Sequence, residues 1–253
     1  DMTLGIIGAG NVGKKVQQMA RVMGMNVLVN DPPRERVEGK AGFVSLEELA
    51  ERSGIVSFHV PLTHDGPDPT FRLGDKNFFD RVRRGTSIIN TSRGGVIDES
   101  MLTSRIKSGQ ISGTVIDVWE NEPEIDMRLL QLADLATPHI AGYSQDGKWN
   151  ASKIIFEQFL EFFKLERGDI IIGKPGDPEN KVIRLDGVGS LEEGFSRAIT
   201  ATYDIVSDSA KLKASPSDFE SLRNNYPVRR EFHAYRVQGP AEIISGLWKL
   251  GFS

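Results

Sequence analysis

The sequence predicts an α/β fold: a doubly wound parallel sheet, followed by a small C-terminal α+β unit. Two observations support this prediction. Short apolar runs alternate with amphipathic stretches as far as about residue 140, and after residue 180 the pattern changes to a short mixture of strand-like and helix-like segments. Strands that alternate with helices favour a parallel sheet covered by helices on both faces.

The apolar runs give the expected strands, which are Leu4–Ile7, Asn26–Val29, Ile55–Val60, Ser87–Asn90, Gly113–Val118 and Asp134–Ala136. The amphipathic stretches give helices near residues 12–24, 46–52, 75–83 and 99–108. Ser45, followed three residues later by Glu48, is a capping box and predicts the start of the second of these helices.

We expect three parts along the chain: a sheet domain over 1–145, a crossover helix with a linker over 146–180, and a C-terminal domain over 181–253. Residues 146–163 are apolar over more than one face, which predicts a core helix that is buried on two sides. Residues 164–180 are rich in Gly, Pro and charge, which is typical of a linker.

The last part of the chain has its own predicted elements. They are a strand at Val182–Leu185, a helix from Ser190 with apolar residues at helical spacing as far as Ile205, a short helix from Ser217 to near Tyr226, a strand at Glu231–Val237 and a helix at Ala241–Leu250. A unit of this size is small for an independent core, so a second subunit is its natural partner.

The composition excludes several kinds of partner. A net charge of −4 gives no reason to expect nucleic acid or a membrane surface as a partner, and no apolar run is long enough to span a bilayer. With no cysteine, the chain has no disulfide and no thiolate, and we expect a cytoplasmic protein. No cluster of His, Asp and Glu has the spacing of metal ligands, so we expect no metal.

Three glycines after the first expected strand indicate a nucleotide site. Gly8, Gly10 and Gly13 fit the pattern G-x-G-x-x-G, which alone is a weak signal because it can be only a tight turn. Here the loop joins a strand to a helix, so its N–H groups and the helix N-terminus can face a pyrophosphate. Gly8 would make the turn, Gly10 would admit the phosphates and Gly13 would let helix pack on strand, as in a Rossmann domain.

Asp31 indicates which dinucleotide binds. It ends the second expected strand, 18 residues after Gly13 (31 − 13), where a carboxylate accepts hydrogen bonds from the ribose hydroxyls and repels a 2′-phosphate. NAD is therefore favoured over NADP. Pro32 and Pro33 are expected to hold a rigid turn, and Arg34 is the opposing signal because an arginine there can accept a 2′-phosphate.

Three polar residues follow later strands, at the edge of the sheet where such folds bind ligands. They are Arg93, Glu122 and His139. Each alone is more often a surface residue, but together they form a chemical set. An arginine can hold a substrate carboxylate, a histidine can take a hydroxyl proton, and a carboxylate behind the imidazole can orient it. The set fits oxidation of a 2-hydroxy acid to a 2-oxo acid.

The other histidines are given ordinary roles. His59 ends a strand and is expected to pack near the cofactor, and His64 and His233 are expected in loops or on the surface.

Several motifs together resemble the D-isomer-specific 2-hydroxyacid dehydrogenase family. They are Gly8-x-Gly10-x-x-Gly13, His59-Val60-Pro61-Leu62, Asn90-x-x-Arg93-Gly94, Asp117-Val118-Trp119 and Pro138-His139-Ile140. The resemblance implies that Arg93 binds the substrate, that Glu122 is the orienting carboxylate and that His139 is the proton donor. It also implies NAD contacts at Asn11, Val12, Asp31, Val60, Asp117 and Gly142, with Asp117 reaching the carboxamide.

Finer features resemble one branch of that family. They are Asp31-Pro32-Pro33-Arg34, the insertion from Thr63 to Pro67, the run from His139 to Tyr143 followed by Gly147 and Lys148, and the tail with Phe219–Tyr226 and Arg229–Glu231. For this branch the resemblance implies a small phosphorylated 2-hydroxy acid as substrate, Tyr143 as a substrate contact and a homodimer formed through the C-terminal domain. It also implies a substrate-binding segment ahead of the first glycine in family members, so that this chain alone would bind NAD with little turnover.

Two other functions stay open from the sequence. One is another D-2-hydroxyacid dehydrogenase, for example one that acts on 3-phosphoglycerate. The other is a non-catalytic NAD-binding dimer module, which would gain nothing from keeping Arg93, Glu122 and His139 together.

Overall fold

A computed structural model describes residues 2–168, 170 and 172–253. The chain divides into two units. The first unit comprises the residues up to Ala141 together with Ile205–Asn225, and the second comprises Gly142–Asp204 together with Tyr226–Ser253. Each unit is described by itself.

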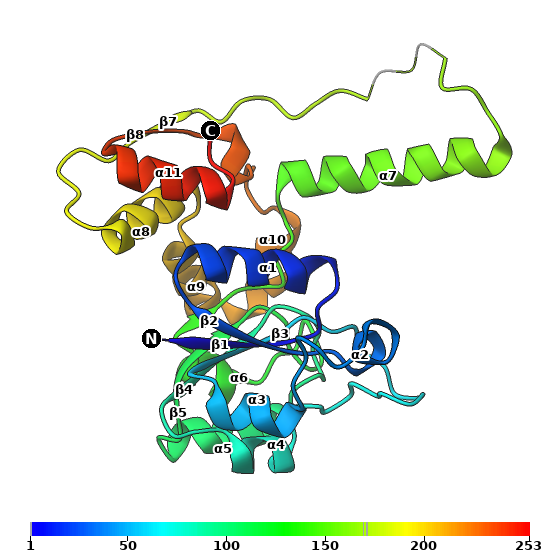
Figure 1. Cartoon of the computed structure of the whole chain (residues 1–253), viewed down its shortest axis with the longest axis vertical. Coiled ribbons are helices and arrows are strands. Elements are labelled where there is room, and N and C mark those ends of the chain that lie inside the picture. Colours follow the sequence, from blue (N-terminus) through cyan, green and yellow to red (C-terminus); the bar gives the residue numbers. More distant parts are fainter. Residues whose placement is uncertain (1, 169, 171) are drawn as a thin grey trace. The chain divides into compact units, whose positions relative to one another are not determined.

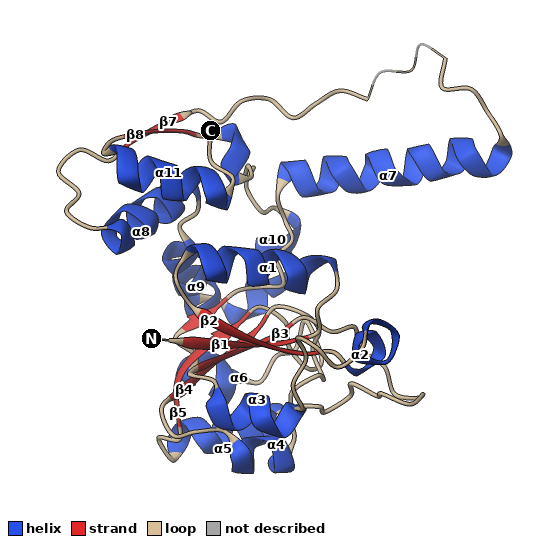
Figure 2. Cartoon of the chain, viewed as in Figure 1, coloured by secondary structure: helices blue, strands red, loops and turns tan. Residues whose placement is uncertain are grey.

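The first unit is built on a parallel sheet, which Figure 2 shows in red. Within the described residues its six strands are β1 (Thr3–Ile7), β2 (Asn26–Asn30), β3 (Ile55–Phe58), β4 (Thr86–Asn90), β5 (Ile111–Ile116) and β6 (Leu135–Ala136). Their order is β2-β1-β3-β4-β5-β6, and every neighbouring pair is parallel. The predicted α/β fold with a doubly wound parallel sheet is therefore confirmed.

The strand order contains a switch point between β1 and β3. The chain passes from β1 to β2 on one side, and it then returns to add β3 on the other side of β1. At such a point the two crossovers leave the sheet in opposite directions, which opens a crevice beyond the carboxyl ends of the strands. The predicted glycine loop follows β1 and therefore lies at this crevice.

Helices cover both faces of the sheet. The helices of this unit are α1 (Asn11–Val22), α2 (Pro32–Glu38), α3 (Leu46–Arg52), α4 (Lys76–Arg81), α5 (Glu99–Lys107), α6 (Met127–Leu132), α9 (Ile205–Ala214) and α10 (Phe219–Asn224), with a 3₁₀ turn at Pro216–Asp218. Figure 1 shows α1 on one face, and α3, α4 and α5 on the opposite face. Side chains of the sheet and of the helices that pack on it form a fully buried core, which includes Phe58, Phe79, Leu49 and Ile88.

Most expected elements of the first unit are present with small shifts at their ends. Ser45 caps α3 through the N–H of Glu48, as its capping box predicts. Three helices of this unit have no counterpart in the prediction, α2, α6 and α9. Pro32 and Pro33 form the first turn of α2, where proline is tolerated because its missing N–H would have no partner in the helix.

The structure differs from the predicted boundary of the C-terminal domain, because residues 205–225 belong to the first unit. Leu212 and Phe219 are 0% and 1% exposed and lie in the same buried cluster as the sheet residues. The hydroxyl of Ser209 accepts the N–H of Ala136 in β6 at 3.0 Å. The sequence pattern shows that these helices have an apolar face, but not which unit covers it.

The second unit combines a long helix with a small α+β part. Its elements are α7 (Gln145–Phe163), β7 (Val182–Arg184), α8 (Leu191–Thr202), a 3₁₀ turn at Phe232–Ala234, β8 (Arg236–Gln238) and α11 (Ala241–Leu250). The strands β7 and β8 pair in parallel. The predicted strand over 231–237 is only partly correct, since its first half is the 3₁₀ turn.

Close contacts hold this unit together. A Cβ atom at Gly194 would lie 2.4 Å from the side chain of Ile243, so α8 and α11 pack at short range. At the start of α7, the guanidinium of Arg230 forms two hydrogen bonds with Asp146, at 2.8 and 2.9 Å. Both side chains are buried, and the hydrogen bonds from Arg230, helped by its charge, lower the pKa of Asp146 to about 2.

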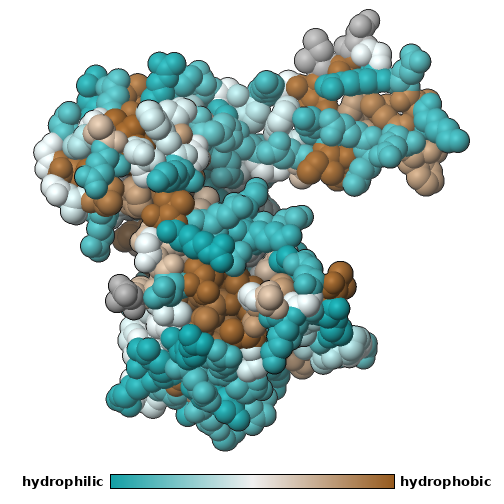
Figure 3. Space-filling view, viewed as in Figure 1, coloured by the Kyte–Doolittle hydropathy of each residue, from teal (hydrophilic) through white to brown (hydrophobic). Residues whose placement is uncertain are grey.

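The prediction that the helix over 146–163 is buried on two sides is wrong for this structure. Ile154, Ile155, Phe159 and Phe163 in α7 are at least half exposed, and Phe162 is 80% exposed. Figure 3 shows brown apolar side chains on the surface of this helix. A dense apolar pattern predicts that a helix face will be covered, and it does not predict what covers it. Among the described helices, none is both long and apolar enough to cross a bilayer.

We predict that Phe219→Ala destabilises the first unit, because it leaves a cavity in the core shared by α10 and the sheet. The expected loss in the free energy of unfolding is about 3–5 kcal/mol, measured by urea denaturation with hydrogen exchange at the β5 and β6 amides. Val206→Ala in α9 is the control, because Val206 is 64% exposed, and we expect it to change stability by less than about 0.5 kcal/mol. Equal effects of the two variants would contradict the assignment of 205–225 to the first unit.

Candidate functional site

The turn after β1 has the geometry of a phosphate cradle. Gly8 has φ +90°, and a Cβ atom there would lie 2.6 Å from the carbonyl oxygen of His59. A Cβ atom at Gly13 would lie 2.0 Å from the Gly8 oxygen, whereas one at Gly10 would meet nothing within 4 Å. Gly8 and Gly13 thus allow close packing, and Gly10 leaves open space in front of the loop.

The N-terminus of α1 is arranged for an anion. Gly10 is its N-cap and no side chain caps it, so the N–H groups of the first turn remain for a ligand. Asn11 and Val12 in this turn are both exposed. Both were predicted to touch NAD, and their position at the mouth of the loop is consistent with that prediction.

Asp31 joins the glycine turn to α2. One oxygen of its carboxylate accepts the N–H of Ala9 at 2.8 Å, and the other accepts the N–H of Arg34 at 3.0 Å and so caps α2. The Arg34 guanidinium donates to the Ala9 carbonyl at 2.6 Å and to Glu38 at 2.7 Å. The Arg34 guanidinium is therefore already paired with the Glu38 carboxylate, which leaves it less available to bind a 2′-phosphate.

A pocket of about 790 Å³ lies between the ends of β1, β2 and β3 and the segment 63–70. Gly8, Gly10, Asp31 and Val60 are among its lining residues, as predicted for a dinucleotide site. The charged residues that line it are five carboxylates and one guanidinium, namely Asp31, Glu35, Glu47, Asp65 and Asp68 with Arg36. Because Arg36 is paired with Asp68, the pocket disfavours an additional phosphate charge.

His59 is a lining residue of the same pocket. Its Nε2 atom lies 2.9 Å from the hydroxyl of Ser57, and burial lowers the pKa of His59 to about 4. The ring is therefore neutral at pH 7, which fits the packing role expected from the sequence.

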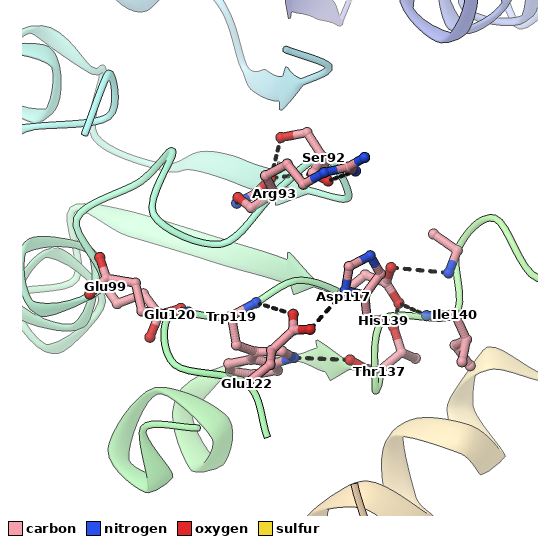
Figure 4. Close-up of polar contacts among 12 residues, drawn as sticks. Ser92, Arg93, Glu99, Asp117, Trp119, Glu120, Glu122, Thr137, His139 and Ile140 are labelled. Carbon is pink, nitrogen blue, oxygen red and sulfur yellow. Dashed lines mark hydrogen bonds and ion pairs between the residues drawn. The ribbon is translucent and has the colours of Figure 1, made fainter. Parts of the chain in front are cut away.

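Glu122 and His139 meet beyond the ends of β5 and β6. The Nδ1 atom of His139 lies 2.8 Å from Oε2 of Glu122, as Figure 4 shows. A carboxylate can only accept, so Nδ1 carries the proton and Nε2 is left as the reactive atom of the ring. The other Glu122 oxygen accepts the N–H of Trp119 at 2.9 Å, which fixes the carboxylate from its own loop.

Asp117 organises the loop that carries His139. Its carboxylate accepts the hydroxyl of Thr137 at 2.6 Å and the N–H groups of Ile140 and Ala141 at 2.8 and 3.0 Å. His139 has φ +56°, which is uncommon for any residue but glycine, and its N–H donates to the Asp117 carbonyl at 2.7 Å. Burial raises the pKa of the Asp117 carboxyl, and these hydrogen bonds oppose that rise.

Arg93 is exposed and lies in a turn that its own neighbours shape. Oδ1 of Asn90 accepts the N–H and the hydroxyl of Ser92, and Nδ2 of Asn90 donates to the Arg93 carbonyl at 3.1 Å. The Arg93 guanidinium donates to the Ser92 carbonyl at 2.6 Å. In the described structure Arg93 is thus bound within its own turn, whereas Glu122 and His139 are bound to each other.

The Arg93 turn and the Glu122 loop are nevertheless in close contact. A Cβ atom at Gly94 would lie 1.9 Å from the Trp119 carbonyl oxygen, so only glycine allows this approach. The indole of Trp119 donates to the Thr137 carbonyl at 3.0 Å. Trp119 therefore links the turn of Arg93 to the loops of Glu122 and His139.

Gly142 and Tyr143 begin the second unit, and their predicted contacts with NAD and substrate stay predictions. In that unit the Tyr143 ring packs edge-on to Tyr226 and beneath the Lys148 ammonium. No group of three or more possible metal ligands occurs in the part of the chain that the structure describes.

Sequence reasoning missed two residues of this region, Asn90 and Glu99. Asn90 had a signal, because an Asn at a strand end followed by Ser two residues later commonly forms such a turn. Glu99 is buried and accepts the N–H of Glu120 at 2.6 Å, and because its partner lies 21 residues away, no local sequence pattern points to this contact.

Comparison with protein families agrees with this geometry. The model described as "D-isomer specific 2-hydroxyacid dehydrogenase, NAD binding domain" matches residues 1–141. A second model, described as a domain of unknown function (DUF3410), matches residues 177–251.

Curated relatives match over most of the chain. An erythronate-4-phosphate dehydrogenase from Bacteroides fragilis is 46% identical over 93% of this chain, and the chain covers 65% of the length of that relative. One from Escherichia coli is 37% identical over the whole chain, which covers 68% of its length. The chain thus spans less than two thirds of the Bacteroides relative.

Solved structures show the same fold. A D-lactate dehydrogenase from Aquifex aeolicus, complexed with NAD and lactic acid, matches 69% of this chain and 58% of its own chain with 28% identity and a TM-score of 0.55. A fungal glyoxylate reductase matches 67% of this chain and 51% of its own chain with 28% identity and a TM-score of 0.58.

Proposed function

The chain belongs to the D-isomer-specific 2-hydroxyacid dehydrogenase family, and we propose that it oxidises 4-phospho-D-erythronate with NAD. The C2 hydroxyl becomes a ketone, the product is 2-oxo-3-hydroxy-4-phosphobutanoate, and NAD⁺ becomes NADH with release of one proton. The reaction belongs to the biosynthesis of pyridoxal 5′-phosphate. The names of the relatives with 37–46% identity support this substrate.

The observation that carries the proposal is the hydrogen-bonded pair of Glu122 and His139 at the edge of an NAD-binding domain. An NAD-binding module without catalysis would need neither the pair nor the strained backbone of His139, whose φ is +56°. The geometry therefore favours the enzyme over the module.

The residues of the chain would act as follows. His139 Nε2 accepts the proton of the substrate hydroxyl, and Glu122 stabilises the resulting imidazolium through Nδ1. Arg93 binds the substrate carboxylate, for which its exposed guanidinium offers a pair of parallel N–H groups. NAD supplies the hydride acceptor.

The glycine turn, the uncapped α1 and the acidic pocket fit NAD. The pyrophosphate would lie at Gly10, Asn11 and Val12, and the ribose hydroxyls at Asp31, whose two oxygens each keep a further lone pair. Val60, Asp117 and Gly142 complete the proposed contacts. Asp117 is only 1% exposed, so the carboxamide would contact only the small exposed part of this carboxylate.

For the second unit we propose a substrate contact at Tyr143, a homodimer formed through the C-terminal domain, and a cytoplasmic location. The small size of the α+β part and the exposed apolar residues Val228 and Trp248 support a partner. The absence of cysteine is compatible with the cytoplasm.

The substrate and the base are tested together on the whole protein as its gene encodes it. We expect kcat/KM for 4-phosphoerythronate to exceed that for 3-phosphoglycerate, and His139→Gln to lower kcat by about 10²- to 10⁴-fold because the proton acceptor is lost. His64→Gln makes the same change at an exposed histidine and should have no effect. Preference for 3-phosphoglycerate would reject the substrate, and an active His139→Gln variant would reject the base.

The cofactor preference is tested with Asp31→Asn. Asparagine keeps an acceptor that can cap α2 but loses the charge that attracts ribose hydroxyls and repels a 2′-phosphate, so we expect NAD affinity to fall about tenfold and the preference for NAD over NADP to shrink. Asp75→Asn changes the N-cap of α4 in the same way, away from the pocket, and should leave both affinities unchanged. The measurement is fluorescence titration with NADH and NADPH, and an unchanged ratio for Asp31→Asn would show that Asp31 does not select the cofactor.

The oligomer is tested by light scattering at micromolar concentration. We expect the mass of a dimer, and Trp248→Glu, which places a charge on the exposed face of α11, to shift it toward the monomer. A monomer mass for the unmodified chain would contradict the proposal.

A further inference from the structure

Glu99 lies at the start of α5, next to the loop that carries Glu122. It is 7% exposed, and its Oε1 atom accepts the N–H of Glu120 at 2.6 Å. Figure 4 shows Glu99 beside Glu120 on the neighbouring loop, and the Glu122 carboxylate of that loop extending toward His139. Neither the mechanism nor the cofactor site uses Glu99.

The surroundings of Glu99 are acidic. Burial, together with the charges of Glu120, Asp126 and Glu122, raises the pKa of Glu99 to about 7, and the hydrogen bond from the Glu120 N–H opposes this rise. On its own helix the neighbouring acid is Asp98, which caps α5 through the N–H of Met101 and pairs with Arg72 at 3.4 Å. Near neutral pH, Glu99 therefore exchanges between a neutral acid and an anion among like charges.

The loop can transmit a displacement of Glu120 to the catalytic pair. Gly94 packs against the Trp119 carbonyl on one side, and the Trp119 N–H is bound to Glu122. Glu120 thus directly follows Trp119, whose carbonyl and N–H are both in contact with other groups, and it precedes Glu122 by two residues. A change in the bond between Glu99 and Glu120 would therefore act on the loop that carries the Glu122 carboxylate.

We propose that Glu99 is a positioning residue for the Glu122–His139 pair: as a neutral acid it holds the loop 119–122 in place, and as an anion it repels the loop and loosens the pair. The structural part of this proposal is independent of the substrate. Its kinetic consequence rests on the proposed function.

The direct test observes the His139 ring by NMR in the 253-residue chain, which has four histidines, so that His139→Gln assigns the signal. We expect the His139 ring shifts to show an additional inflection near pH 7, where Glu99 ionises. Glu99→Gln keeps an acceptor for the Glu120 N–H but cannot ionise, and it should remove that inflection. Glu124→Gln removes an exposed carboxylate of the same loop and should leave it.

Stability gives a second readout with a defined sign. Because the pKa of Glu99 is higher in the folded chain than its ordinary value of 4.5, the folded state retains a proton that the unfolded state has lost. The free energy of unfolding therefore falls as pH rises from 4.5 to about 7, and above about pH 7 this contribution falls no further. Glu99→Gln should show a smaller fall over this range than Glu124→Gln.

Kinetics on the whole protein separates positioning from a merely structural role. We expect the ratio of kcat at about pH 6 to kcat at about pH 8 to be several-fold smaller in Glu99→Gln than in the unmodified enzyme, with an unchanged Kd for NADH. Absence of any turnover of 4-phosphoerythronate would reject the proposed function and leave the NMR result to decide on Glu99. An inflection that persists in Glu99→Gln, or one that is absent from the unmodified chain, would overturn the proposal.

Discussion

The site depends above all on the Asp117 carboxylate. It is almost completely buried and accepts one hydroxyl and two backbone N–H groups from the segment 137–141. These bonds offset the cost of burying the carboxylate. They also hold His139 at a positive φ, a conformation that costs on the order of 1 kcal/mol for a residue with a side chain. Without this anchor, the imidazole would have no fixed direction in which to meet Glu122.

The parallel sheet also fixes the directions of the other loops at this edge. Backbone hydrogen bonds continue beyond the strand ends, from Gly8 to Asn30, from His59 to Ile7 and from Asp117 to Asn90. Each loop therefore leaves the sheet in a direction that its neighbour fixes. The switch point lies between β1 and β3, where the pocket opens, and the Glu122–His139 pair follows β5 and β6. The cofactor binding and the proton transfer that we propose would thus take place beyond different strands at one edge of the sheet.

The sequence predicted the parts of the structure in which local chemistry allows one solution. The glycine turn is an example, since a side chain at Gly8 or Gly13 would collide with backbone atoms. The pairing of Glu122 with His139 was predicted from their chemistry and their places beyond strand ends, and the family resemblance agreed, although 17 residues separate them and no local pattern joins them. The assignment of α9 and α10 and the exposure of α7 could not be predicted. An amphipathic pattern records that a face is apolar, and the contact that covers it comes from another part of the fold.

Acidic residues show most clearly why a residue type does not reveal its role. Asp31 lines an open pocket and accepts two backbone N–H groups, whereas Asp117 is buried and accepts one hydroxyl and two N–H groups of a single loop. Glu99 is also buried, but it faces three carboxylates and a single N–H, so the neutral form becomes accessible near pH 7. In the sequence all three are acids at or just beyond the predicted end of a strand or the start of a helix. Their environments differ in burial and in the groups that reach each carboxylate, and both are set by the tertiary structure.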